Sequence, residues 1–355
     1  MKLHALLLLT ILAIFTSCNG QPPTPPPPPP MAAVGDTVTS SQMGDSILVI
    51  YQAKDNTYWF GTHGRGVYKY DGNTIIRFNI DNGLSNNYVR DIKEDNAGNI
   101  YISNFNGINK YDGKTITNPD VAYPDGDWKL APGDLWFANE LSVGKPYRYN
   151  GNGFYQLSFP KNSKEDAYHK MFPYVTFSPY GIYTTYTDSK GRIWFGTAAL
   201  GVGCYDGKAF TWINEDDLTE IHNGPSNGIR SIKEDKDGVF WFSNTFYKYT
   251  ITQNATGGIT YKREKGLDIP KSYGISGFEY MSATVDDSGN FWIVTYSDGV
   301  WKYDGKNITR YPIQNAKGNV TLYSIYKDRQ GTLWLGTHTD GVYKFNGEGF
   351  EKVKL

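Results

Sequence analysis

Hydrophobic and polar residues alternate along the chain in short runs that are separated by turn-forming residues. In one example, VRDIKED (89–95) is followed by an Asn-Ala-Gly turn and then by NIYIS, GINKY and KTITN. Val, Ile and Tyr with a period of two favour strands, and Asx-Gly pairs between such runs favour tight hairpins. The pattern therefore predicts a unit of four short antiparallel strands, A to D in chain order.

The unit is repeated seven times, and each copy carries an aromatic residue at one equivalent place. These residues are Trp59, Tyr101, Trp136, Trp194, Trp241, Trp292 and Trp334. A long repeat that is built only of strands and turns is typical of a β-propeller. We therefore predict an all-β fold over residues 34–355, a seven-bladed β-propeller of four-stranded antiparallel blades. Each blade packs between two others, so the aromatic row is expected in the core.

Turn residues support this division into blades. Five units share an Asp-x-x-Gly turn between strands A and B, at Asp95, Asp188, Asp235, Asp286 and Asp328. The Asp can accept hydrogen bonds from its own turn, and the Gly takes the left-handed conformation. The fifth unit lacks the Asx-Gly pair between strands C and D, so we expect a longer hairpin around Gly257-Gly258.

The N-terminus has the features of an export signal. Residues 1–17 contain one Lys, an apolar run and small residues, and the run is too short to span a membrane. The segment Phe15-Thr16-Ser17-Cys18 resembles the lipobox of Bacteroidetes-type lipoproteins, which implies lipidation of Cys18; an ordinary signal peptide cut nearby is the alternative. Residues 18–33 then form a Pro-rich linker. We expect an exported outer-membrane lipoprotein that faces the periplasm or the cell surface, with the membrane as one partner.

Composition argues against several other classes of protein. The net charge is −1 and no Lys/Arg-rich tract is present, so nucleic acid is not an expected partner. The chain has five His, and these are not accompanied by a set of carboxylates, so neither a metal nor another cofactor is expected. Cys204 lies in a predicted strand and is expected to be a small buried residue.

The repeat D-x-x-G-x-[LI]-W-[FIL]-G-T…G-[VL]-x-[KR]-[YF]-[DN]-G resembles the two-component regulator propeller repeat. The approaches GLSNNYVRDIKED (83–95) and GPSNGIRSIKED (224–235) carry the same resemblance, which covers residues 47–354. In that family the repeats often form the periplasmic sensor half of hybrid histidine kinases that detect glycan fragments. The chain shows no kinase and no membrane-spanning segment after the last repeat, so the resemblance implies a free-standing lipoprotein member.

One face of the predicted propeller is the expected binding face. The D–A links between blades and the B–C loops share this face, and the links vary in length while the turns on the other face do not. Such variation indicates binding. The candidate ligand-binding residues on this face are His63, Arg65, Arg90, Phe105, Glu140, Arg230, Tyr296, His338 and Asp340.

Each candidate group also has a less specific interpretation. His63 and His338 occupy the same place in the first and last blades. Three interpretations of this pair are open: part of a small-ligand site, a metal-binding pair, or ordinary solvated loop residues. Arg90 and Arg230 point at a ligand or pair with nearby acidic residues. The aromatic insert at 160–181 is either a contact surface for a sugar or a protein, or packs onto the propeller.

We therefore expect a lipid-anchored binding module for glycan fragments or a protein partner rather than an enzyme. The first alternative is a propeller enzyme of the lyase or glycosidase type with its site at the channel mouth, although no paired carboxylates or Ser/His/Asp order stands out, and no catalytic residue is assigned. The second alternative is a structural scaffold of an outer-membrane assembly.

Overall fold

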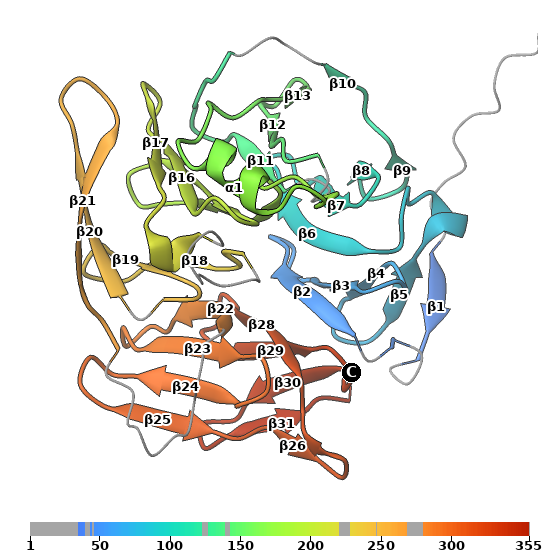
Figure 1. The fold of residues 1–355 in the computed structure, drawn as a ribbon. Coiled ribbons are helices and arrows are strands. Elements are labelled where there is room, and N and C mark those ends of the chain that lie inside the picture. The colour runs from blue at the N-terminus through green and yellow to red at the C-terminus, as the bar shows by residue number, and fades with distance from the viewer. Residues whose placement is uncertain are drawn as a thin grey trace, which may run out of the picture. The chain divides into compact units, whose positions relative to one another are not determined.

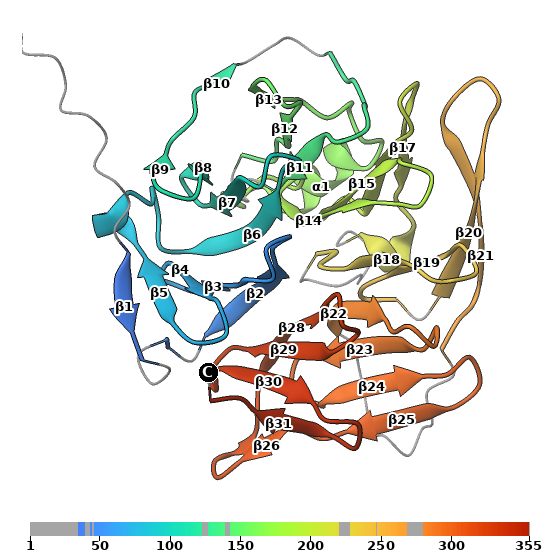
Figure 2. The ribbon, with the colours of Figure 1, turned by 180° about the vertical axis from the view of Figure 1, so that it is seen from behind.

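The computed structural model describes residues 35–39, 43–44, 46–122, 127–138, 143–219, 228–245, 247–267 and 280–354. Residues 32–355 form one compact unit. Within it, seven sheets are arranged in a ring (Figures 1 and 2), so the predicted seven-bladed β-propeller is confirmed. The predicted signal peptide, Cys18 and the Pro-rich linker lie outside the described residues.

Five blades follow the predicted order, with strand A innermost and strand D outermost. Blade 2 contains β6 (Val89–Glu94), β7 (Ile100–Asn104), β8 (Gly107–Tyr111) and β9 (Ile116–Thr117). Blade 4 contains β14 (Ile182–Thr187), β15 (Ile193–Thr197), β16 (Val202–Tyr205) and β17 (Phe210–Ile213). Blade 5 contains β18 (Ile232–Glu234), β19 (Val239–Phe242), β20 (Tyr247–Gln253) and β21 (Ile259–Lys265). Blade 6 contains β22 (Tyr280–Val285), β23 (Phe291–Thr295), β24 (Val300–Tyr303) and β25 (Ile308–Tyr311). Blade 7 contains β28 (Leu322–Lys327), β29 (Leu333–Thr337), β30 (Val342–Phe345) and β31 (Phe350–Lys352).

Two blades vary this plan. Blade 1 has β2 (Ile47–Gln52), β3 (Tyr58–Thr62), β4 (Val67–Tyr70) and β5 (Ile75–Phe78), and β1 (Asp36–Val38) adds a fifth strand beside β5. Blade 3 has β11 (Leu135–Phe137), β12 (Tyr147–Tyr149) and β13 (Phe154–Gln156). Its fourth strand, β10 (Val121–Ala122), pairs with β13 in parallel on the outer edge. The innermost strand of blade 3 is thus β11, which corresponds to strand B of the other blades.

The links between blades contain short elements. The helix α1 (Glu165–Met171) lies in the link between blades 3 and 4, and the hairpin β26 (Gln314–Asn315) to β27 (Gly318–Asn319) lies between blades 6 and 7. The 3-10 turns η2 (Ile80–Asn82) and η3 (Asp216–Leu218) follow blades 1 and 4. The β20–β21 hairpin of blade 5 turns at Gly257 and Gly258, as predicted, and projects from the ring (Figure 1).

The aromatic row forms the core between the blades, as expected. Trp194 of blade 4 lies 4.6 Å from Phe240 of blade 5, and Trp241 of blade 5 lies 4.9 Å from Phe291 of blade 6, measured between ring centroids. Sheets approach closely beside this row because strand B carries a Gly. A Cβ atom at Gly196 would overlap the carbonyl oxygen of Ile229 in the next blade.

The Asp of each A–B turn has a larger role than the sequence predicted. One oxygen of Asp286 accepts hydrogen bonds from the backbone N–H groups of Ser288 and Asn290, while the other accepts the indole N–H of Trp292 at 2.8 Å. The same arrangement, called the Asp clamp below, recurs in blades 2, 4, 5 and 7. Its members are Asp95 with Tyr101, Asp188 with Trp194, Asp235 with Trp241, and Asp328 with Trp334.

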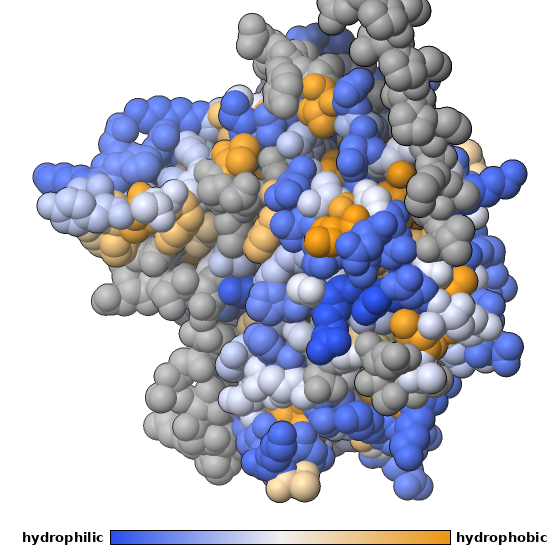
Figure 3. All heavy atoms as spheres, turned by 90° about the vertical axis from the view of Figure 1, so that its right-hand side faces the viewer, coloured by the Kyte–Doolittle hydropathy of each residue, from blue (hydrophilic) through white to orange (hydrophobic). Residues whose placement is uncertain are grey.

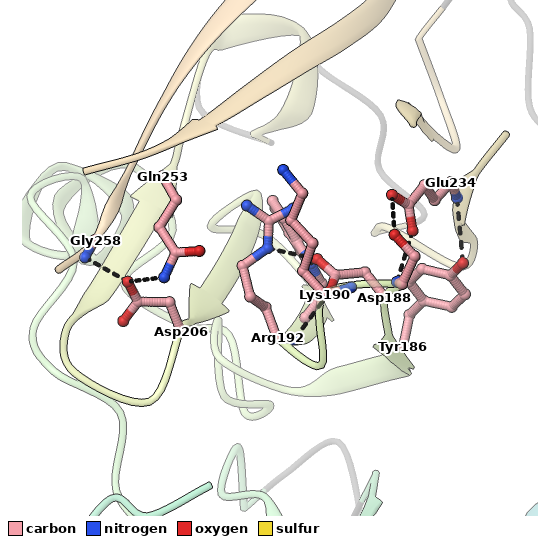
Figure 4. A network of polar contacts seen from close by, with 10 residues as sticks. Tyr186, Asp188, Lys190, Arg192, Asp206, Glu234, Gln253 and Gly258 are labelled. Atoms are coloured by element: carbon pink, nitrogen blue, oxygen red, sulfur yellow. Dashed lines mark hydrogen bonds and ion pairs between the residues drawn. The ribbon is translucent and has the colours of Figure 1, made fainter. Parts of the chain in front are cut away.

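In blade 4 the clamp extends into a wider polar network (Figure 4). Asp188 also accepts a hydrogen bond from the buried guanidinium of Arg192 at 2.6 Å. Glu234 of blade 5 reaches the same turn, where its carboxylate accepts hydrogen bonds from the backbone N–H and the hydroxyl of Ser189. The clamp therefore joins a turn to its own core residue, and the neighbouring Glu joins two blades.

The ring closes between blades 7 and 1 without a shared strand. Tyr58 of β3 donates its hydroxyl to Asp328 at 2.8 Å, and the backbone N–H of Gln52 donates to the hydroxyl of Tyr326 at 3.1 Å. The Gln52 side chain also bonds to Gln330. Side-chain hydrogen bonds across packed faces therefore hold the ends of the ring together.

The outer surface near β1 and β5 is mainly hydrophilic, with hydrophobic residues in small separate patches (Figure 3). Arg77 of β5 pairs there with Asp36 of β1 at 2.6 Å. No helix within the described residues is long and apolar enough to cross a membrane.

Candidate functional site

The channel mouth is built by equivalent residues at the start of the inner strands. Five of the six A strands carry an irregularity after their first residue, at which the pairing register shifts. Such an extra residue re-aims a side chain, and here it turns the second residue of the strand toward the channel. The residues at this place, one from each blade except blade 3, are Leu48, Arg90, Tyr183, Arg230, Met281 and Tyr323.

Two adjoining cavities occupy the channel and its mouth. The inner cavity, of about 340 Å³, is lined by all six of these residues together with Tyr88 and Phe105. The outer cavity, of about 350 Å³, adds His63, Tyr296 and His338 from the B–C loops. Both volumes lie in the range of small-ligand pockets.

His63 and His338 come together as the sequence predicted, since blades 1 and 7 are neighbours. Their ring centroids lie 5.8 Å apart, and Tyr88 packs edge-on against His63 at 4.3 Å. Burial, and secondarily the nearby His338, lowers the pKa of His63 below its usual value. His63 is therefore mainly neutral at pH 7 and can accept a proton or a hydrogen bond.

Arg90 and Arg230 contact aromatic rings at the mouth. The guanidinium carbons of Arg90 and Arg230 lie 5.7 Å and 4.2 Å from the ring centroid of Tyr183. Arg90 also lies 5.8 Å from Phe105, and it donates a hydrogen bond to the carbonyl oxygen of Ile182 at 3.1 Å. Burial lowers the pKa of Arg90. Both arginines are thus held in the channel by cation–π contacts.

The arginines do not pair with acidic residues in the described part of the chain, which was the other interpretation of these positions. Asp91 lines the inner cavity beside Arg90, but its carboxylate lies 3.1 Å from the ammonium group of Lys93. Nε of Arg230 is buried without a hydrogen-bond partner. The mouth therefore carries two positive charges whose nearest described contacts are aromatic rings, a hydroxyl and a carbonyl oxygen.

Tyrosine hydroxyls complete the site. Burial, with a smaller contribution from Tyr323, raises the pKa of Tyr88 to about 12. Tyr88 also stacks on Phe105, with centroids 4.0 Å apart and an interplanar angle of 15°. The hydroxyl of Tyr323 accepts a long hydrogen bond of 3.4 Å from Arg230. Tyr88 therefore stays protonated at neutral pH, and the tyrosine hydroxyls lie beside the guanidinium groups.

The remaining predicted site residues lie elsewhere. Asp340 points to its own blade, where it accepts hydrogen bonds from the Tyr343 hydroxyl and from Lys352. The exposed Arg65 lies against Gly44. Glu140 falls outside the described residues. Of the nine predicted residues, the structure gathers His63, Arg90, Phe105, Arg230, Tyr296 and His338 at the mouth.

The aromatic insert at 160–181 divides into a packed part and an exposed part. Tyr168 is 1% exposed and packs with Leu200 and Phe172. Tyr174 is 94% exposed and Phe177 is 41% exposed. Packing onto the propeller thus accounts for one part, and a contact surface remains available in the other.

Sequence reasoning missed Leu48, Tyr88, Tyr183, Met281 and Tyr323. A signal for four of them was present, because Leu48, Tyr183, Met281 and Tyr323 occupy the same repeat position as Arg90 and Arg230. Aligning the six A strands in phase would have assigned one mouth residue to each blade except blade 3. The described residues contain no group of three or more His, Cys, Asp or Glu arranged to hold a metal. Cys204 is buried in β16, which raises the pKa of its thiol.

The fold and the open channel mouth define the class of the protein, a seven-bladed β-propeller with a ligand-sized cavity on one face. The chain is similar to the two component regulator propeller family, whose model matches residues 83–106, 176–199, 223–246 and 316–339. Each match runs from a link through strands A and B of one blade. No curated protein matches the chain.

Solved structures share the fold at low sequence identity. The extracellular domain of a one component system from B. thetaiotaomicron is 19% identical, with a TM-score of 0.58 over 87% of this chain and 39% of that one. This chain thus spans about two fifths of that domain. Streptogramin B lyase is 16% identical, with a TM-score of 0.61 over 86% of this chain and 95% of that one. Inactive virginiamycin B lyase from Staphylococcus aureus, solved with Quinupristin, is 17% identical, with a TM-score of 0.58 over 87% and 97%.

Proposed function

We propose that the protein is a binding module whose channel mouth takes a small ligand such as a glycan fragment. The observation that carries the proposal is the pair of adjoining cavities, which six blades line with aromatic, imidazole, guanidinium and aliphatic side chains. A concave site with a few convergent polar groups is the usual form of a small-ligand site. Regular blades supply the rigid support for these groups.

A binding screen tests the proposal. The purified protein is mixed with a library of glycan fragments, and ligands are detected by a rise in the thermal unfolding midpoint. We expect at least one hit, and we expect it to disappear when His63, Tyr296 and His338 are changed to Ala together. A hit that survives these changes would move the site, with Tyr174 and Phe177 of the insert as the next candidates.

A negative screen would favour the alternative ligand, a protein. In that case the exposed part of the insert, which includes Tyr174, is the proposed contact surface. Co-purification with an outer-membrane complex that is lost in a Tyr174→Ala, Phe177→Ala variant would favour the scaffold function. The matched control is Tyr261→Ala, which changes an exposed tyrosine on the outer strand β21.

We propose that the propeller is exported and held at a membrane through a lipid on Cys18. Support comes from residues 1–17 and the lipobox-like segment that precedes Cys18. Metabolic labelling with a fatty acid should mark the wild-type protein and not Cys18→Ala, and the variant should leave the membrane fraction. Equal labelling of both would contradict the lipid anchor and leave the mouth unaffected.

A second candidate function is catalysis at the same mouth. His63 favours it, because a mainly neutral imidazole inside a ligand-sized cavity can act as a general base. Turnover of a bound ligand by the wild-type protein, lost in His63→Ala while the ligand still binds, would identify an enzyme. Binding without turnover over extended incubation would leave the binding module.

A further inference from the structure

The inner cavity contains two cationic side chains close to one aromatic ring. Arg90 and Arg230 both line it, and the Tyr183 ring lies within 5.7 Å of the first guanidinium and 4.2 Å of the second. The two groups come from blades 2 and 5, so they converge from separate parts of the ring. Like charges that approach each other in a partly dry cavity repel, which costs folding free energy.

Nothing in the described part of the chain neutralises this pair. The only carboxylate among the residues lining the inner cavity is Asp91, which is paired with Lys93 at 3.1 Å. Arg230 makes one long hydrogen bond, to the hydroxyl of Tyr323 at 3.4 Å, and its buried Nε has no partner. Elsewhere buried arginines do have partners, as Arg148 does with Asp134 at 2.8 Å. An uncompensated charge in a cavity is a mark of a functional site.

We propose that the ligand of the mouth is a small acidic sugar, with its carboxylate or sulfate group bound between Arg90 and Arg230. This inference rests on the proposed function and specifies the class of ligand. Guanidinium groups offer planar paired donors that match such oxyanions. The stacked pair of Tyr88 and Phe105 offers an apolar wall for a sugar ring, and the tyrosine hydroxyls and the two imidazoles suit its hydroxyl groups.

Cavity size favours a sugar of one or two rings over a protein segment. The inner cavity of about 340 Å³ adjoins the outer one of about 350 Å³, and Arg230 lines both, so the charged pair lies next to the rim that His63, Tyr296 and His338 form. A flat protein surface could enter cavities of this size only with single side chains. A small acidic sugar is therefore the ligand that fits the two adjoining cavities.

Matched acidic and neutral sugars test the inference by titration calorimetry. The probes are glucuronate against glucose, galacturonate against galactose, and galactose 6-sulfate as the sulfate source. We expect at least one acid to bind about tenfold or more tightly than its neutral partner, with an affinity that falls as salt is added. Carboxylate and sulfate are distinguished by which of the acids binds best.

Charge variants then assign the effect to the arginines. Arg230→Gln should weaken the acid about tenfold or more and change neutral-sugar binding by less than about twofold, because only the charge-assisted bonds are lost. Arg230→Lys, which keeps the charge, should fall between the two. The control Arg263→Gln changes an arginine that pairs with Glu215 and Asp217 near the outer strand β21, and it should bind as wild type. Unchanged thermal midpoints confirm that the variants are folded.

The outcomes separate this inference from the proposed function. Equal binding of an acid and its neutral partner, or an unaffected Arg230→Gln variant, would overturn the acidic ligand while the binding module stands. Binding only to a protein, abolished by changing an Asp or Glu of that protein, would also overturn it. If neither acidic nor neutral sugars bind, the small-ligand function and the inference fail together.

Discussion

Two regions of the molecule treat buried charge in opposite ways. At the A–B turns, the guanidinium of Arg192 is 2.6 Å from the carboxylate of Asp188, which also accepts the Trp194 indole. At the channel mouth, Arg230 lies on Tyr183 and pairs with no carboxylate among the described residues. The polar groups of the clamped turns pair with one another and stabilise the fold. The polar groups of the mouth remain available to a ligand.

The largest expected effect comes from breaking the clamp of blade 4. Asp188→Ala leaves the buried Arg192 without a counter-charge and removes the acceptor of Trp194. We expect a loss of about 3–5 kcal/mol in the free energy of unfolding, measured by denaturant titration. The double variant Asp188→Ala, Arg192→Leu should recover part of this loss, because the unpaired charge is gone.

The exposed Asp237 provides the control for this prediction. It lies in the A–B turn of blade 5 and pairs with the adjacent Lys236. Asp237→Ala should change the free energy of unfolding by less than about 0.5 kcal/mol. A similar small loss in Asp188→Ala would show that the clamp is not a main support of the fold.

The two blades without a clamp allow a finer test. Trp59 and Trp136 have no Asp six residues earlier, and their buried indole N–H groups have no partner among the residues that the structure describes. Trp292 donates the same group to Asp286 at 2.8 Å. Trp292→Phe should therefore cost about 1–2 kcal/mol more than Trp136→Phe, because both lose similar volume and only one loses a hydrogen bond to a charged group. Equal thermal and denaturant stability of the two variants would contradict this role of the clamp.

The contrast between the clamped turns and the mouth also explains which features of the fold could be predicted from the sequence. The Asp-x-x-Gly turns and the aromatic row predicted the blades because turn chemistry and strand alternation are local. Blade 3 departs from the plan because its preceding segment, 118–134, provides β10 at the outer edge in place of an inner strand A. No local pattern marks that change, since it depends on which edge of the sheet the segment meets.

The mouth was predicted in part for a similar reason. Repeat phase placed His63 and His338 side by side, because equivalent positions of the first and last blades are neighbours in a closed ring. Repeat phase also gives Tyr183 and Tyr323 equivalent positions. The shift in pairing register that turns them toward the channel, however, is not visible in a pattern of alternating residues. Repeat phase was less informative for Asp340, because its hydrogen-bond partners Tyr343 and Lys352 lie on its own blade.

A pair of arginine variants compares the two regions directly. Arg148→Met removes a buried guanidinium that pairs with Asp134, whereas Arg230→Met removes a half-buried one that pairs with no acid among the described residues. We expect a loss of about 3 kcal/mol or more in the free energy of unfolding for Arg148→Met. For Arg230→Met we expect a change within about 0.5 kcal/mol, because relief of repulsion from Arg90 offsets the lost cation–π contact. A loss above about 2 kcal/mol in Arg230→Met would make that residue structural.

The smallest expected effect concerns His63, whose pKa is lowered by burial and, to a lesser degree, by His338. Because the unfolded chain binds the proton more readily than the folded one, His63 contributes stability above the unfolded pKa of about 6.5, and this is lost as the pH falls below it. NMR titration of the imidazole should give a midpoint below 6.5. His338→Gln should raise that midpoint only part of the way, since burial is the larger cause. A midpoint at or above 6.5 in the wild-type protein would mean that His63 is solvated like an ordinary loop residue, and the mouth would lose its neutral proton acceptor.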